Sequence, residues 1–286
     1  MNYNPEIIVV VGPTASGKSD FAVDLALKNN GEVISADSRQ IYKGLDIGTG
    51  KITKKEMGGI PHHLLDVCDV GTDFSVAEYK KIAEPILEEI ISRGKTPIIC
   101  GGTGQYIDSL IFNTTIPEVK LNKELRGKLE KKNTEELYKL LLKKDSRRAE
   151  EIDKHNRVRI IRALEIIESL GKVPTQDTPK LKYKTKIYLM SPSRELLRER
   201  ITARLHKRLK QGMIAEVKTL IKHLGPSSVD MKKFGLEYVT IAKFLEGKIS
   251  KENMEQEIIT KSMQYGKRQD TWNKKYIPIA NIISVE

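Results

Sequence analysis

Apolar positions in the first hundred residues fall into short continuous runs separated by longer periodic stretches. Continuous runs predict buried strands, and apolar residues three or four positions apart predict amphipathic helices. Strands are predicted at 7–11, 32–35, 63–67 and 96–100. Strands that alternate with helices are typical of a parallel sheet covered by helices. In such a sheet, ligands bind at the carboxyl ends of the strands.

Later parts of the chain follow a different pattern. Residues 122–171 are almost wholly helical in pattern and rich in charge, and residues 174–186 read as a polar linker. Beyond the linker we predict a strand at 186–190, a basic helix at 193–210 and further helices. A last strand is predicted around 277–285. This order indicates a helical insertion in a core that is built from both ends of the chain.

Two helices have clear boundaries. The helix before the fourth strand begins near Ser75, where Glu78 completes a capping box, and Gly94 follows its last apolar residue as a stop. A shorter amphipathic helix is predicted over Asp20–Lys28, directly after the first strand and an intervening loop.

That loop, Gly12–Ser19, has the form G-x-x-x-x-G-K-[ST] and stands between a predicted strand and a predicted helix. In this context the backbone N–H groups and the helix N-terminus bind phosphate, the lysine binds a terminal phosphate, and the serine hydroxyl suits Mg²⁺. A di- or triphosphate ligand is therefore expected. The predicted phosphate-binding residues are Gly12, Pro13, Thr14, Ala15, Ser16, Gly17, Lys18 and Ser19. We predict an α/β protein with a P-loop NTPase-like parallel-sheet core (1–117 and 187–286) and an inserted all-helical domain (118–186).

Charge is unevenly distributed along the chain. Residues 1–100 contain 11 Lys/Arg and 14 Asp/Glu, whereas the remainder contains 39 and 24, for a total net charge of +12. This asymmetry predicts a polyanionic partner such as nucleic acid, although Lys-rich helices can also serve only solubility. The two cysteines lack metal-type spacing and fit a reducing, cytoplasmic compartment. No signal peptide or membrane-spanning run is visible, so no membrane association is expected.

Two further strand ends carry candidate chemistry. Asp37 follows the second strand and is expected to face the ligand, where it could accept a proton, position a nucleophile or hold Mg²⁺ through water. It could also cap a turn, but its placement at a strand end beside the phosphate loop favours a functional role. The fourth strand ends in Gly101-Gly102-Thr103 instead of the aspartate that often organises Mg²⁺ in kinases. This difference weakens a kinase interpretation.

Two arginine pairs lie on predicted helices. Arg159 and Arg162 share one face of the insertion helix that begins near Asn156, and Arg200 and Arg204 lie one turn apart on the basic helix. Phosphate contacts and ordinary solvation both explain such pairs. The single tryptophan, Trp272, is predicted to anchor the core.

Six segments, which together span nearly the whole chain, resemble the tRNA dimethylallyltransferase family, also called the IPP transferase family. The P-loop alone is weakly specific, whereas the P-loop, the segment Asp37–Gly44 and the segment Arg268–Trp272 in this order are highly specific. The segments are Gly12–Ser19, Ser35–Thr49, Pro61–Asp66, Gly101–Thr103, Arg159–Glu165 and Lys267–Trp272.

The resemblance implies transfer of a dimethylallyl group from dimethylallyl diphosphate to N6 of the adenine immediately 3′ of the tRNA anticodon. It implies a Mg²⁺-dependent monomer in the cytoplasm, whose insertion binds the anticodon stem-loop. By position it implies that Asp37 is the general base and that Thr103 lies near the adenine. It also implies that Lys18, Ser19 and an arginine of the Arg200/Arg204 pair bind the diphosphate, with Ser19 as the metal ligand. The implied tRNA-contacting residues are Asp37, Ser38, Arg39, Gln40, Thr103, Arg126, Val158, Arg159, Ile160, Ile161, Arg162, Lys232, Lys233 and Gly235.

Three alternatives stay open on the sequence. The first is a nucleoside or small-molecule kinase that uses the same loop with ATP. The second is isopentenyl transfer to free adenine nucleotides, although a small acceptor does not require a large basic insertion. The third is an RNA-binding switch that uses a nucleotide only to change its shape.

Overall fold

The computed structural model describes residues 6–175, 178–224 and 230–285. The chain forms two compact units: a core unit, Met1–Asn113 with Leu181–Glu286, and an insertion unit, Thr114–Lys180. The insertion unit begins at 114 and ends at 180, where 118 and 186 were expected. A bridge between Phe112 and Leu181, and a hydrogen bond from Lys182 N–H to the Ile111 carbonyl (2.8 Å), belong to the core unit. These backbone contacts place both boundaries earlier in the chain than the predicted ones.

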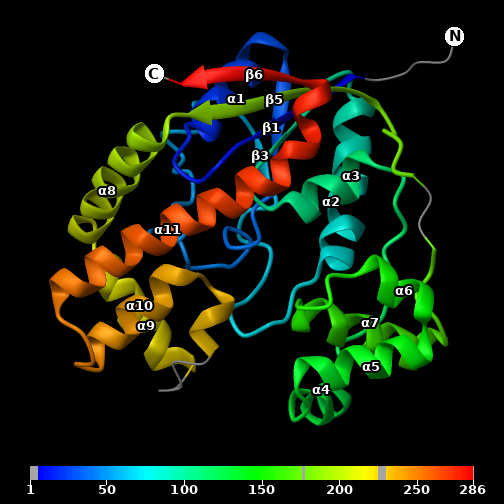
Figure 1. Ribbon diagram of the computed structural model, residues 1–286. Helices are drawn as coiled ribbons and strands as arrows, with labels where there is room; N and C mark the ends of the chain where they lie inside the picture. Colours follow the sequence, from blue (N-terminus) through cyan, green and yellow to red (C-terminus); the bar gives the residue numbers. More distant parts are fainter. Residues whose placement is uncertain (1–5, 176–177, 225–229, 286) are drawn as a thin grey trace, which may run out of the picture. The chain divides into compact units, whose positions relative to one another are not determined.

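The core unit contains a six-stranded sheet in the order β3-β2-β4-β1-β5-β6, in which every pair is parallel (Figure 1). The predicted parallel sheet is confirmed. The prediction of a strand over 63–67 is wrong beyond His63, because Leu64 and Asp66 adopt positive φ angles that end the strand. The strands are β1 Glu6–Val11, β2 Gly31–Ser35, β3 His62–His63, β4 Thr96–Cys100, β5 Lys184–Pro192 and β6 Ala280–Val285.

Side chains of β1 alternate between the two faces of the sheet, as the two-residue period of a strand requires. Ile8 and Val10 share one apolar cluster with residues of α1 (Lys18–Lys28). Ile7 and Val9 belong to a second, larger cluster with residues of several other helices. Both faces of the central strand are therefore buried, which explains its continuous apolar run.

The larger cluster is covered by helices from both ends of the chain. The predicted capping box opens α2: Ser75 Oγ accepts the Glu78 N–H (3.2 Å), and the Glu78 carboxylate accepts the Ser75 N–H (2.6 Å). Trp272 packs against this cluster, as predicted for an anchor. The helices are α2 Val76–Ser92, α3 Gly104–Ile111, α8 Arg194–Lys210, α9 Met213–Leu224, α10 Leu236–Leu245 and α11 Lys251–Asn273, with 3-10 turns at Asp230–Lys233 and Lys274–Ile279.

The insertion unit is all-helical and has an apolar cluster of its own. On the helix that begins near Asn156, the spacing of Val158, Ile161, Leu164 and Ile167 predicts one apolar stripe. Ile161, Leu164 and Ile167 lie in this cluster, but Val158 is 75% exposed and does not. In the described part of the chain, no helix combines the length and apolarity needed to span a bilayer. The helices of the unit are α4 Lys123–Glu130, α5 Thr134–Lys144, α6 Ser146–Glu151 and α7 Arg157–Leu170.

Candidate active site

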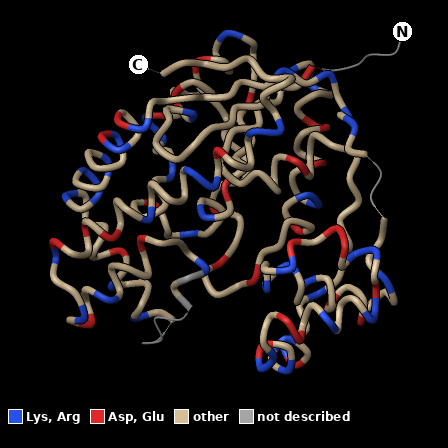
Figure 2. The backbone as a smooth tube through the Cα atoms, in the orientation of Figure 1, with Lys and Arg blue, Asp and Glu red and all other residues tan. Residues whose placement is uncertain are grey.

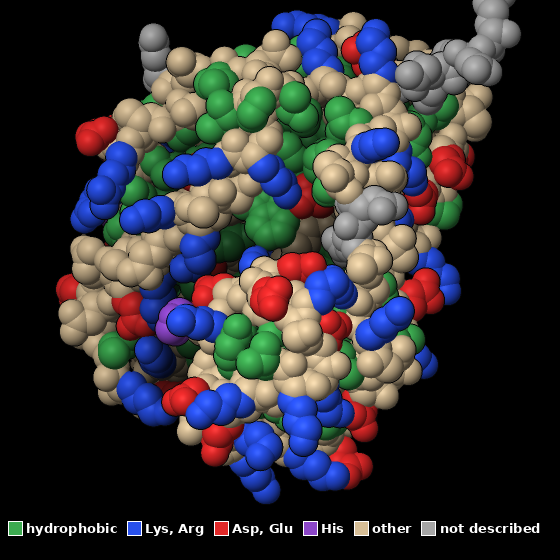
Figure 3. Space-filling view, turned by 45° about the vertical axis from the view of Figure 1, so that its right-hand side comes forward, with side chains coloured by type: hydrophobic (Ala, Val, Ile, Leu, Met, Phe, Trp, Pro, Cys, Tyr) green, Lys and Arg blue, Asp and Glu red, His purple; other side chains and the backbone are tan. Residues whose placement is uncertain are grey.

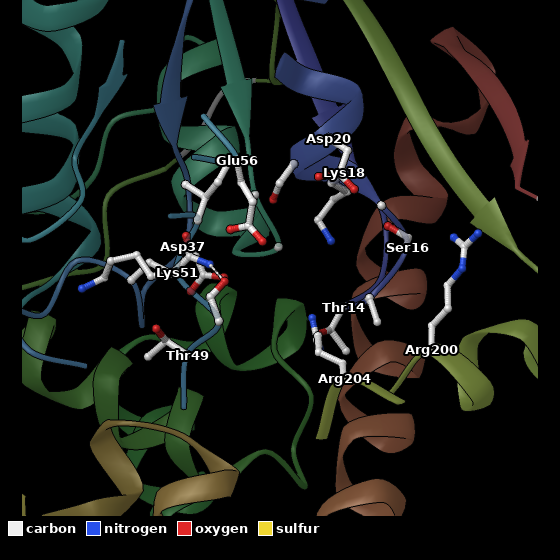
Figure 4. Close-up of a pocket in the computed structure, with 18 of the residues that line it drawn as sticks. Thr14, Ser16, Lys18, Asp20, Asp37, Thr49, Lys51, Glu56, Arg200 and Arg204 are labelled. Carbon is white, nitrogen blue, oxygen red and sulfur yellow. Dashed lines mark hydrogen bonds between the residues drawn. The ribbon is translucent and has the colours of Figure 1, made fainter. Parts of the chain in front are cut away.

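A cavity of about 830 Å³ lies in the core unit, beyond the carboxyl ends of β1, β2 and β4. This is where a parallel sheet places its ligand. Figure 4 shows Thr14, Ser16 and Lys18 on one side of the cavity, and Asp37 and Thr49 on the other. The cavity therefore has a phosphate-loop wall and a carboxylate-bearing wall.

The phosphate-loop wall depends on two glycines. At Gly12 a Cβ would lie 2.8 Å from both the Cβ and the carbonyl oxygen of Met190, so only glycine allows this approach to β5. Gly17 adopts φ +87° immediately before α1, a conformation that glycine reaches without strain. The loop thereby directs the N-terminus of α1, with its unpaired N–H groups, to the cavity.

Lys18 is held over the loop by a hydrogen bond from its Nζ to the Pro13 carbonyl (2.6 Å). Burial lowers the pKa of Lys18 to about 8, because a charged ammonium is disfavoured away from water. Ser16 Oγ and Arg204 Nε are buried, and neither has a hydrogen-bond partner among the described residues. Buried polar atoms are nearly always paired, so both atoms indicate a place for a polar ligand.

Besides Lys18 and Lys51, the basic side chains at the cavity come from α8, along which Lys and Arg are frequent (Figure 2). Arg204 Nη2 donates to Thr14 Oγ1 (2.6 Å), and Arg200 points toward the loop (Figure 4). Arg208, one turn beyond Arg204, is only 8% exposed and also lines the cavity. Burial, followed by the charge of Arg208, lowers the pKa of Arg204. Such concentrated positive charge is stabilised by a bound polyanion.

Asp37 both caps a turn and faces the cavity, which are the two alternatives that the sequence left open. Its Oδ1 accepts the Arg39 N–H (2.8 Å), which is a turn cap, and its side chain also lines the cavity. Thr103 Oγ1 accepts the Ser38 N–H (2.9 Å) and donates to Ser38 Oγ (3.2 Å). Arg39 in turn donates to the carbonyl of Lys233. The structure thus brings together residues 37–39, Thr103 and Lys233 from three distant segments.

The loop fits a magnesium ion. Ser19 and Asp20 lie exposed in the first turn of α1, at the cavity. Among the described residues no group of three or more His, Cys, Asp or Glu could hold a metal. P-loop sites do not need such a group, because Mg²⁺ there keeps several waters and takes one hydroxyl together with phosphate oxygens. The Ser19 hydroxyl is the protein ligand that this arrangement offers.

The loop at residues 46–51 forms part of the second wall and was not predicted as a site. The Glu216 carboxylate, from α9, accepts N–H bonds from Asp46 (2.9 Å), Ile47 (2.8 Å) and Gly48 (2.8 Å). The Tyr238 hydroxyl donates to the same carboxylate (2.7 Å). No local signal identifies Glu216, because its partners in the loop lie about 170 residues away and Tyr238 lies 22 residues away.

Replacing Glu216 with alanine is expected to loosen this loop without unfolding α9. Hydrogen bonds to a charged group contribute about 1.5–3 kcal/mol each, so amide exchange at 46–48 should accelerate at least about tenfold. Hydrogen–deuterium exchange measures this rate. Lys218→Ala, at an exposed position of the same helix, is the matched control and should leave exchange at 46–48 unchanged. Equal exchange in both variants would contradict the anchoring role.

In the insertion unit, two arginines expected to contact RNA are engaged by a buried carboxylate. Arg126 forms a two-point ion pair with Glu165 (3.0 and 2.8 Å), and Glu165 is 1% exposed. Arg162 lies 3.5 Å from the same carboxylate and donates to the Val119 carbonyl (2.8 Å). Both arginines therefore hold this unit together. Arg159 is exposed, and its guanidinium lies on the surface with the side chain of Val158.

Two of the expected RNA-contacting side chains require correction. Ile160 and Ile161 are 0% and 6% exposed in the core of the insertion unit, so their side chains offer no surface to a partner. Gly235 has φ +133° and precedes α10, a backbone conformation that favours glycine. Gln40 lines the cavity and donates to the Gly50 carbonyl (3.2 Å). The side chain of Lys232 lies outside the described residues.

Comparison with known proteins identifies relatives along nearly the whole chain. The sequence model of the family described as IPP transferase matches residues 40–276. A tRNA dimethylallyltransferase of Caldanaerobacter subterraneus subsp. tengcongensis is 42% identical over 283 residues, which cover 95% of this chain and 89% of that protein.

Solved structures also identify relatives along nearly the whole chain. The full-length tRNA isopentenylpyrophosphate transferase of Bacillus halodurans superposes with a TM-score of 0.72 at 34% identity, covering 98% of this chain and 89% of that one. A eukaryotic dimethylallyltransferase acting on tRNA superposes with a TM-score of 0.85 at 28% identity, covering 98% and 74%.

Proposed function

The chain belongs to the IPP transferase family, and we propose that it is a tRNA-modifying enzyme that transfers a dimethylallyl group from dimethylallyl diphosphate to N6 of the adenine immediately 3′ of the anticodon. The observation that carries this proposal is the shared cavity, which has the phosphate loop on one wall and Asp37 on the other. None of the relatives named above is a kinase. The kinase alternative is therefore without support.

The cavity suits the reaction because each wall meets one reactant. The adenine N6 attacks the allylic carbon, the carbon–oxygen bond breaks, and diphosphate leaves with the bonding electrons. Lys18 and Arg204 stabilise the charge that develops on the leaving group. Asp37 accepts the N6 proton, which restores a neutral amine on the product. A magnesium ion at Ser19 would neutralise part of the diphosphate charge.

Acceptor recognition requires the adenine to leave its stack, at a cost of a few kcal/mol. Contacts to the RNA backbone can offset this cost, and Lys and Arg side chains are numerous on the face shown in Figure 3. We assign Ser38, Arg39, Gln40, Thr103 and Lys233 of the core unit, and Val158 and Arg159 of the insertion unit, to tRNA contact. We further propose that the protein acts as a monomer in the cytoplasm, where its substrate is found.

Incubation with radiolabelled dimethylallyl diphosphate and an unmodified anticodon stem-loop tests the proposal. We expect label in N6-dimethylallyladenosine after nuclease digestion. Parallel reactions with γ-labelled ATP and candidate small acceptors test the kinase alternative, and free adenosine monophosphate tests transfer to nucleotides. Label in a phosphorylated acceptor, or only in the free nucleotide, would overturn the proposal.

Replacing Arg159 with alanine is expected to weaken tRNA binding without changing its sequence preference. Each phosphate contact contributes about 0.7–0.9 to the slope of log affinity against log salt, so the slope should fall by about one unit. Titrations of the stem-loop at several salt concentrations measure it. Lys139→Ala is the control, because Lys139 is already paired with Glu135 on α5. An unchanged slope for Arg159→Ala would exclude a phosphate contact.

A further inference from the structure

Gln269 of α11 joins the two walls of the cavity. The side chain is 7% exposed, and its Oε1 accepts the backbone N–H of Thr14 in the phosphate loop (2.7 Å). Its Nε2 donates to the carbonyl of Gly102, after β4 (3.0 Å). One amide thus accepts from the phosphate loop and donates to the turn after β4, and both segments line the cavity.

The surroundings are shaped to this amide. At Gly102 a Cβ would lie 2.1 Å from Gln269 Nε2, so glycine leaves room for the bond. Thr14 is fixed from a second direction, since its hydroxyl accepts from Arg204. A carboxylate at position 269 would lack the donor, and an aliphatic side chain would lack both groups.

The chain of contacts continues from Gly102 to the carboxylate. The Thr103 N–H donates to the Ala36 carbonyl (3.0 Å), and the Thr103 hydroxyl holds Ser38. Asp37 lies between Ala36 and Ser38 in the chain, so Thr103 contacts both of its neighbours. The position of the phosphate loop is therefore linked to the position of the carboxylate through hydrogen bonds that meet at Gln269.

We propose that Gln269 is a positioning residue that sets the diphosphate-bearing half of the site in register with the Asp37–Thr103 half. This inference rests on the proposed prenyl transfer. Transfer requires the allylic carbon and N6 to approach within about 3–3.5 Å, and a misplacement of about 1 Å can cost about 100-fold in rate. Gln269 itself contacts neither reacting atom in this assignment.

The proposal predicts that the rate of transfer falls while the separate affinities persist. Gln269→Met keeps the size of the side chain but removes both hydrogen bonds. We expect its single-turnover rate, at saturating donor and stem-loop, to fall about 30–100-fold. The Kd values for inorganic pyrophosphate and for the stem-loop should stay within about threefold, because Lys18, Arg204 and Arg159 remain. Gln256→Met, which alters an exposed amide on the same helix, should match the wild type.

A second variant, at Gly102, disrupts the same hydrogen bond between Gln269 Nε2 and the Gly102 carbonyl. Gly102→Ala inserts a methyl group against Nε2, and it should lower the rate in a similar way. The rate of the double variant should be little lower than that of either single variant, because all three variants break the same linkage. Should Gln269→Met fail to fold, Gly102→Ala carries the test.

Each outcome has a distinct meaning. Wild-type rates in both variants would overturn the positioning role, as would a loss of rate matched by an equal loss of pyrophosphate or stem-loop affinity. Additive effects in the double variant would show that the two residues act separately. A wild-type protein that does not alkylate the stem-loop would instead overturn the proposed function itself.

Discussion

Replacing Asp37 with alanine is expected to lower the rate of prenyl transfer by about 10²–10⁴-fold while leaving tRNA affinity nearly intact. A positioned general base contributes a factor of this size, and Asp37 is a carboxylate on the wall opposite the phosphate loop. Single-turnover transfer to the stem-loop measures the rate, and equilibrium binding of the same RNA measures the affinity.

Asp37→Asn is the matched control for this prediction. The asparagine oxygen can still accept the Arg39 N–H, so the turn that follows β2 keeps its cap. The asparagine cannot accept the N6 proton, and its rate should fall as far as that of the alanine variant. If Asp37→Asn retains activity, or if rate and RNA affinity fall by the same factor, Asp37 is a binding residue.

Replacing Lys18 with alanine is expected to weaken donor binding by about 10–100-fold, which corresponds to the loss of one charged hydrogen bond. The rate of the bound complex should fall by about 10²–10³-fold as well, because the charge on the leaving group grows in the transition state. Titration with inorganic pyrophosphate and single-turnover transfer separate the two effects. Normal pyrophosphate affinity would remove Lys18 from the diphosphate site.

The same lysine predicts a pH dependence. Burial lowers the pKa of Lys18 to about 8, so the charged form in the free protein is lost as the pH rises through that value. Pyrophosphate affinity should therefore decline above pH 8, by roughly tenfold for each pH unit that a single proton controls. Lys18→Arg, which stays charged, and Lys18→Ala, which has no charge to lose, should both lack this decline. A decline that persists in both variants would assign the titration to another group.

Much of the fold could be predicted because its signals are local. The strands around Ile7–Val11 and Thr96–Cys100, the capping box at Ser75 and the phosphate loop each depend on residues within a few positions of one another. The shortened β3 could not be predicted, because apolar content continues past His63 while the backbone turns at Leu64. Val158 fits the helical period of its stripe, yet it lies outside the packed cluster of its unit.

By itself, the sequence determined the phosphate loop and the parallel α/β core, since spacing and hydrophobic period encode these features along the chain. It also placed Asp37 at the end of the second strand, while the role of Asp37 as a general base is implied by the resemblance and stays a prediction. Only the tertiary structure decided which polar side chains complete the site. Gln269 reaches Thr14 across 255 positions, and Glu216 reaches Ile47 across 169. It also decided that Arg126 pairs with the buried Glu165. The sequence around a single polar residue on a helix does not predict its hydrogen-bond partner, because tertiary packing brings the two residues together.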